Sequence, residues 1–111
     1  MINIIQNGTT NLNVNKTMLD YCITLPLATH NCFNFTAIRN GSFGDDVIID
    51  FNGRDYRGHI NAKHIKRANP AFQVALPVQL RNALATLLTT NGVSSSITLH
   101  IDATSQKLYL I

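Results

Sequence analysis

The chain has 111 residues, a formal net charge of +3, and 45% hydrophobic but only 14% charged residues. This length accommodates one hydrophobic core, so we expect a single domain over residues 1–111. No apolar run is long enough to cross a bilayer and no secretory signal opens the sequence, which argues against membrane-spanning and exported proteins and predicts a cytoplasmic one without a membrane partner.

The first part of the chain predicts two strands and one short helix. Ile2 to Ile5 form a short β-branched run that predicts a strand, and the polar segment Gln6 to Asn13 is expected to be a loop. Asn15 can cap a helix from Lys16 to Ile23, because apolar residues recur on one face of that segment. Alternation of polar and apolar residues within His30 to Ile38 predicts the next strand.

The clearest predicted element is a β-hairpin. Alternate residues are apolar in Asp46 to Phe51, and Asn52-Gly53 then supplies the positive φ angles of a tight turn. The return strand is expected to present Arg57 and His59 on the face away from the core. The residues of the two strands that are expected to face the core are Val47, Ile49, Phe51, Tyr56, Gly58 and Ile60.

The second half predicts a charged loop over 61–70, a strand at 71–75, and a helix that starts near Pro77 and carries a Leu-rich stripe. Alternation in Ser96 to Ile101 and in Lys107 to Ile111 predicts a closing hairpin. About seven short strands and two short helices result. The predicted fold class is therefore mainly β (α+β), and a weak echo between residues 12–19 and 72–80, both strand running into helix, favours a single pseudobarrel.

Cysteine and histidine spacing gives no metal motif. Cys22 and Cys32 are expected to be reduced and packed, because the chain has no export signal. A zinc site from Cys22, His30 and Cys32, or from His59 and His64, would lack the paired C-x-x-C or H-x-x-x-H spacing. Packed thiols and surface imidazoles are the favoured interpretation.

Carboxylates and serines give no catalytic motif either. Asp45, Asp46, Asp50 and Asp55 could suggest a metal-dependent nuclease, but no acid-x-Lys pattern follows and Glu is absent, so Asp46 and Asp50 are expected on the solvent face of a strand. Ser42 lacks the nucleophile-elbow pattern, and no phosphate-binding Gly loop occurs. We therefore expect no enzyme, cofactor, metal or small-molecule substrate.

Basic residues are concentrated in one stretch. Five of the nine Lys and Arg residues fall within the fourteen positions 54–67, which contain a single acid, Asp55. Lys and Arg neutralise phosphates, while Asn and His can bond base edges in the major groove, so this stretch predicts double-stranded DNA as the partner. A solvated hairpin connection is the alternative interpretation.

Read in order, the elements resemble the B3-type pseudobarrel, the DNA-binding domain of some plant transcription factors and of the recognition domains of certain restriction endonucleases. The resemblance rests on layout: strand, polar arm, short helix, the run from Val47 to His59, a second polar arm, a strand at 72–74 and a Leu-rich helix. The chain departs from the plant pattern by an insertion over 29–44 and by having no Trp, so the bacterial branch fits better.

The resemblance implies two arms that enter the major groove, here residues 7–13 and 59–69, and a nuclease domain that is fused or associated. Phosphate contacts would come from Lys16, Arg54, Arg57, Lys63, Lys66 and Arg67, and base contacts from Asn11, Asn13, His59, Asn61 and His64. The arms also contain Asn7, Thr9, Thr10 and Asn69.

Other interpretations remain open. The run from Val74 to Arg81, followed by a terminal hairpin, is also similar to the swapped-hairpin subunit of AbrB-type regulators, which bind DNA as dimers. A rival of another class is a protein-binding module, such as a phage inhibitor or an immunity-type protein, that uses the same polar loops. A third, a metal-dependent nuclease around Asp46 and Asp50, predicts magnesium-stimulated cleavage.

Overall fold

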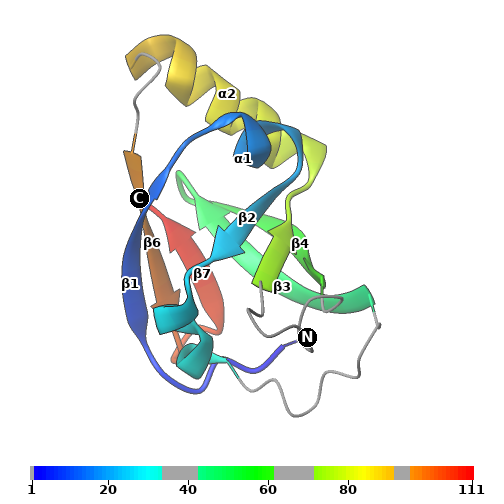
Figure 1. Ribbon diagram of the computed structural model, residues 1–111, viewed down its shortest axis with the longest axis vertical. Coiled ribbons are helices and arrows are strands. Elements are labelled where there is room, and N and C mark those ends of the chain that lie inside the picture. Colours follow the sequence, from blue (N-terminus) through cyan, green and yellow to red (C-terminus); the bar gives the residue numbers. More distant parts are fainter. Residues whose placement is uncertain (1, 34–42, 62–71, 92–95) are drawn as a thin grey trace.

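Seven strands form one curled sheet in the computed structural model, which describes residues 2–33, 43–61, 72–91 and 96–111 (Figure 1). The elements in chain order are β1 (Gly8–Asn13), α1 (Lys16–Asp20), β2 (Cys22–Leu25), the 3₁₀ helix η1 (Leu27–Cys32), β3 (Phe43–Phe51), β4 (Arg54–Asn61), β5 (Phe72–Ala75), α2 (Val78–Asn91), β6 (Ser96–Asp102) and β7 (Lys107–Leu110). With two short α-helices beside this barrel-like sheet, the predicted mainly β fold class is confirmed.

The strand order is β1-β6-β7-β3-β4-β5-β2, so β1 and β2 are the two edges of the sheet. Neighbouring strands run antiparallel, with one exception: β7 lies between β6 and β3 and pairs with β3 in parallel. α2 crosses one end of the curled sheet next to α1 (Figure 1). The strand-then-helix echo of the sequence corresponds to β1 with α1 and β5 with α2.

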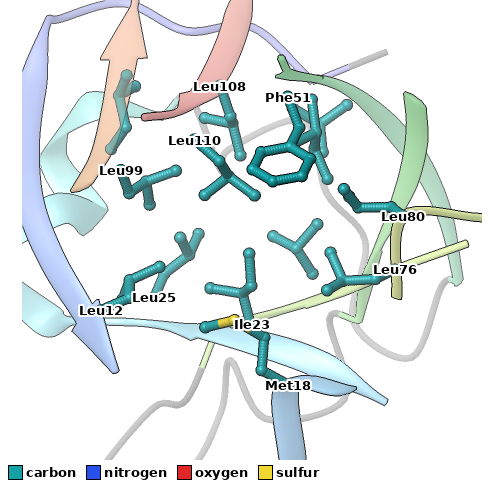
Figure 2. Close-up of a cluster of buried hydrophobic side chains, with 14 of the residues drawn as sticks. Leu12, Met18, Ile23, Leu25, Phe51, Leu76, Leu80, Leu99, Leu108 and Leu110 are labelled. Carbon is teal, nitrogen blue, oxygen red and sulfur yellow. The ribbon is translucent and has the colours of Figure 1, made fainter. Parts of the chain in front are cut away.

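The core fills the inside of the curled sheet. Leu12, Ile23, Leu99 and Leu110 point into one interior from strands far apart in sequence (Figure 2). Leu80 is fully buried on the α2 stripe that covers this interior. Each fully buried side chain of this size contributes about 1.5–3 kcal/mol of transfer free energy, so the shared interior is what holds the edges of the sheet in place.

The predicted β3–β4 hairpin is confirmed. Asn52 and Gly53 have φ angles of 54° and 76°, the left-handed values that a tight hairpin turn requires, and the Gly53 N–H donates to Asp50 Oδ1 at 3.2 Å. The faces are also as predicted, since Arg57 and His59 are exposed. The buried residues of the two strands are Val47, Ile49, Phe51, Gly58 and Ile60, and Tyr56 is half-buried beside them.

The loop predicted for Gln6 to Asn13 is wrong, because Gly8 to Asn13 form strand β1, paired with β6 along its whole length. The inward positions of β1 are Gly8, Thr10 and Leu12. They lie opposite Ile101, Leu99 and Ile97 of β6, and burial of Leu12 against this row outweighs the low strand propensity of Asn and Gly.

The predicted end of the first helix, at Ile23, is also wrong. Asn15 Oδ1 accepts the Met18 N–H at 2.9 Å and so caps α1 as expected, but the helix ends at Asp20. Cys22 to Leu25 instead form β2, in which Ile23 lies opposite Val74 of β5. Backbone pairing with a distant strand overrides the local helical spacing here.

Two further strand predictions need correction. Residues 30–32 belong to η1, whose start at Leu27 follows Pro26; Phe33 makes only an isolated bridge to Ile4, and residues 34–38 lie outside the described residues. Within residues 2–5, the bridge at Ile4 replaces the predicted strand. The Ile2 N–H donates to the Asp46 C=O at 3.0 Å, and the Ile5 N–H donates to the Cys32 C=O at 2.8 Å. The Gln106 side chain also bonds the backbone of Ile4 through both its amide atoms.

Candidate functional site

The polar residues of the predicted first arm lie on strand β1 and face two ways. Thr9, Asn11 and Asn13 are exposed on the outer face, whereas Thr10 is half-buried on the inner face. Thr9 Oγ1 lies 2.8 Å from His100 Nδ1, and Thr98 donates to Asn11 Oδ1 at 3.1 Å. The Asn11 amide group therefore keeps its two N–H donors for an external acceptor.

Asn7 and Lys16 flank this row. Asn7 Oδ1 accepts the Ala103 N–H at 2.8 Å, so Asn7 ties the start of β1 to the turn between β6 and β7. Lys16 is exposed at the first position of α1. Its charge therefore lies just beyond the end of the β1 row.

The described members of the predicted second arm lie on β4 around one aspartate. His59 Nδ1 is 2.7 Å from Asp46 Oδ1, and Arg57 is 3.5 Å from Asp46 Oδ2. The His59 and Arg57 side chains are 58% and 63% exposed while Asp46 is 23% exposed, so the carboxylate sits beneath both groups. Asn61 ends β4. Lys63, His64, Lys66, Arg67 and Asn69 lie outside the described residues.

Arg54 and Arg57 border one shallow hollow. It has a volume of about 310 Å³ and is also lined by Asp55, Tyr56, Pro77 and Gln79. The Arg54 guanidinium carbon lies 5.8 Å from the centre of the Tyr56 ring, which places it over the aromatic face. The Lys107 ammonium donates a hydrogen bond to Asp55 Oδ2 at 2.9 Å, and this bond raises the pKa of Lys107.

The described members of the two arms form two clusters rather than one. β1 and β4 are separated by three strands, β6, β7 and β3. At a spacing of about 4.8 Å between neighbouring strands, four steps along the sheet amount to roughly 19 Å. Because the sheet is curled, the outer faces of β1 and β4 also point in different directions (Figure 1).

Charge is divided unevenly along the chain. All six Asp residues lie in described strands and helices, together with five cations, which gives the described part a formal charge of −1. Residues 62–71, which connect the neighbouring strands β4 and β5, contain Lys63, Lys66 and Arg67 and no acid. The excess positive charge of the chain thus comes from this segment and from Arg39.

The two thiols and the carboxylates of Asp46 and Asp50 lie where the sequence predicts them. Cys22 and Cys32 are free and buried as predicted, and burial raises the pKa of both thiols. Asp46 and Asp50 lie on the outer side of β3, as predicted. Within residues 2–33, 43–61, 72–91 and 96–111, no three His, Cys or Asp side chains form a group that could hold a metal ion.

A second hollow, of about 330 Å³, lies between the two edges of the sheet. β1, α1 and β2 surround it. Its lining residues are Asn11, Leu12, Asn13, Asn15, Met18, Cys22, Ile23 and Thr24.

Comparison of the chain with protein-family models, with curated proteins and with solved structures finds no match. None of the helices in the described ranges combines the length and the apolar character needed to cross a bilayer. A function has therefore to be inferred from the residues of the chain itself.

The sequence reasoning missed two features of this surface. The contact of Asp46 with Arg57 and His59 depends on the β3–β4 register, in which Asp46 lies opposite His59; the Asn52-Gly53 turn sets that register and could have predicted the pair. The hollow between β1 and β2 depends on two strands that the sequence analysis did not predict. β1 (GTTNLN) contains one large apolar residue, Leu12, so local alternation gave no signal for the first.

Proposed function

We propose that the chain binds double-stranded DNA, with segment 62–71 and the adjoining outer face of β4 as its main contact. The observation that supports this is the separation of charge, with three cations and no acid in ten residues attached to a part of the molecule whose formal charge is −1. Phosphate neutralisation supplies most of the affinity in such complexes, and local excess charge is what it requires.

The outer face of β4 adds to the same surface. Arg54 and Arg57 border a hollow large enough to admit a phosphate group, and Gln79 offers an amide donor at its rim. His59 and Asn61 lead into segment 62–71 and are the base-contacting groups of this proposal, with His64 and Asn69 inside the segment.

The β1 row contacts a different part of the duplex in this proposal. β1 and β4 lie four positions apart in the strand order, and the outer faces of the two strands point in different directions (Figure 1). Asn11 and Asn13 with Lys16 therefore bind beside the groove that receives the second arm. This departs from a simple two-jaw arrangement, while keeping the B3-like recognition domain of a restriction endonuclease as the proposed type.

Salt dependence of DNA binding tests the proposal. We expect the affinity for a duplex of random sequence to fall steeply between 50 and 200 mM salt, and K63A/K66A/R67A to lower the slope of log K against log salt by about 3. Binding would be measured by fluorescence anisotropy with the full chain.

A charge-matched variant provides the control. Q6D/N31D/T104D also lowers the net charge by three, at exposed positions before β1, in η1 and in the β6–β7 turn rather than on β4, and should change the slope less. Equal effects of the two triple variants, or an affinity that salt barely changes, would contradict the proposal. Cleavage of plasmid DNA on adding magnesium would instead favour a nuclease within this chain.

A further inference from the structure

The free edge of β1 carries unpaired backbone groups. In β6, the Thr98 N–H donates to the Ile111 C=O at 3.1 Å and the Thr98 C=O accepts the Ile111 N–H at 2.9 Å, on the side of β7. The backbone groups of successive strand residues point to opposite sides, so the N–H and C=O groups of Ile97 and Leu99 point to β1. In β1, Leu12 lies opposite Ile97 and Thr10 lies opposite Leu99. The N–H and C=O of Asn11 and Asn13 therefore point away from β6, to the free edge.

The free edge of β2 is built in the same way. The Leu76 N–H donates to the Tyr21 C=O at 3.1 Å, just beyond the β2–β5 ladder. By the same alternation, Ile23 bonds toward β5, while Cys22 and Thr24 direct their backbone groups to the opposite side. These four residues, two from each edge, all line the 330 Å³ hollow.

The hollow between these edges is uncharged. None of its eight lining residues is Lys, Arg, Asp or Glu, and Met18 and Ile23 give it an apolar floor. Neither β1 (GTTNLN) nor β2 (CITL) contains the charged residue or proline that commonly protects a sheet edge. The volume of the hollow falls at the lower end of the range of about 300–1,000 Å³ for binding pockets.

We propose that this seam, formed by the hollow and the free edges of β1 and β2, binds an extended, uncharged peptide segment of another protein. The peptide adds a strand between β1 and β2. One side of the peptide bonds the backbone of Asn11 and Asn13, and its other side bonds the backbone of Cys22 and Thr24. Main-chain hydrogen bonds give the affinity in this mode of recognition, and side chains directed to the apolar floor give selectivity.

The chemistry of the seam selects this occupant. A nucleic acid requires cations against its phosphates, and the lining has none. Donors and acceptors repeat at every second residue on each edge, about 6.8 Å apart, which matches the repeat of an extended polypeptide. The site is separate from the proposed DNA-contacting surface on β4; it shares Asn11 and Asn13 with the β1 row but uses their backbone groups and not their side chains.

Amide chemical shifts of the full chain, titrated with the blocked peptide acetyl-Thr-Val-Thr-Val-Thr-amide, test the proposal. We expect saturable shifts at Asn11, Asn13, Cys22 and Thr24. The control is the same peptide N-methylated at both Val residues, which removes the donors of one side and should bind at least tenfold more weakly. Shifts that are absent at millimolar peptide, lie elsewhere, or are the same for both peptides overturn the proposal.

Variants of the edge separate this site from DNA binding. T24P removes one outward N–H without removing a bond of the β2–β5 ladder, and an edge strand tolerates proline at such a position. We expect T24P to weaken peptide binding at least tenfold and to leave DNA affinity unchanged, and K63A/K66A/R67A to do the reverse. If T24P unfolds, T24K serves as the second variant, because a lysine on an edge strand disfavours pairing with a further strand, and it should also weaken peptide binding. Unchanged peptide affinity in the folded variant would overturn the proposal.

Discussion

Gly8 lies so close to Cys32 that a Cβ atom added to Gly8 would be 2.6 Å from the Cys32 sulfur. Cys32 is the last residue of η1 and is 4% exposed, so its thiol cannot turn out to solvent without breaking the packing around it. The contact fixes the start of β1 against the segment that follows β2. It thereby closes one end of the gap between the two edge strands.

Alanine at Gly8 should therefore destabilise the fold. We expect G8A to lower the free energy of unfolding by about 2 kcal/mol, as for other additions to a well-packed core. Urea denaturation monitored by circular dichroism measures the change. In a C32A background the same substitution should cost less than about 1 kcal/mol, because alanine removes the sulfur atom. Additive costs in the double variant would show that this contact is not the cause.

Gln106 should help to anchor the chain before β1 at Ile4. Its side chain makes three hydrogen bonds, to the N–H and C=O of Ile4 and to the C=O of Ala103, at 2.9, 2.7 and 2.6 Å. We expect Q106A to cost about 2 kcal/mol and to increase hydrogen exchange of the Ile4 amide.

The backbone of Gln106 allows a matched comparison. Its φ angle is 59°, a value that glycine adopts without the penalty of a side chain. Q106G should therefore lose the same three bonds yet be about 0.5–1 kcal/mol more stable than Q106A. Protection of Ile4 should fall equally in both variants, and retained protection in either would contradict the anchoring role.

Stability at acid pH should depend on Asp102 and Ser105. The Ser105 hydroxyl donates to Asp102 Oδ2 at 2.7 Å, and this bond, together with the Thr104 N–H, lowers the pKa of Asp102. Because the folded-state pKa lies below the unfolded value, the carboxylate stabilises the fold above the unfolded pKa, and this contribution is lost as the pH falls through the folded value.

S105A should therefore raise the pKa of Asp102 and move the acid loss of stability to higher pH. Carbonyl NMR titration of Asp102 measures the first effect, and thermal unfolding at a series of acid pH values measures the second. Y109F removes the bond from the Tyr109 hydroxyl to Ser105 but leaves Ser105 bonded to Asp102, and it serves as the control. An equal rise in both variants would show that the Ser105 bond is not responsible.

Asp46 should limit the proposed DNA affinity, because its carboxylate engages Arg57 and His59. We expect D46N to raise duplex affinity about twofold to fivefold at low salt, the equivalent of up to about 1 kcal/mol for an exposed ion pair. D50N also removes one negative charge from the outer side of β3 but changes a group that bonds Gly53, so it is the matched control. A rise of equal size in D50N would indicate a general charge effect.

Elements with strong local signals were predictable from the sequence. The β3–β4 hairpin and the β6–β7 hairpin follow from strict alternation, and Asn52-Gly53 specifies the first turn by backbone geometry. The same alternation placed Arg57 and His59 on the outer face. α2 followed from its Leu stripe, of which Leu80 is fully buried.

The edge strands were not predictable in this way. β1 is rich in Asn and Thr and β2 has four residues, so each owes its strand conformation to a partner distant in sequence, β6 and β5 respectively. The spatial separation of β1 from β4 follows from the strand order, which local patterns do not encode. For the same reason the hollow between β1 and β2 became visible only with the fold.

The parallel pairing of β7 with β3 has a consequence for the order in which the molecule can be assembled. β7 bridges two groups of strands, β1 with β6 on one side and β3, β4, β5 and β2 on the other. Residues 107–110 must leave the ribosome before these two groups of strands can join. Until then, a nascent chain exposes the unpaired edge of β3. An antibody or chaperone that recognises this strand edge is consequently expected to trap released chains truncated at residue 105 and not chains that extend through residue 111.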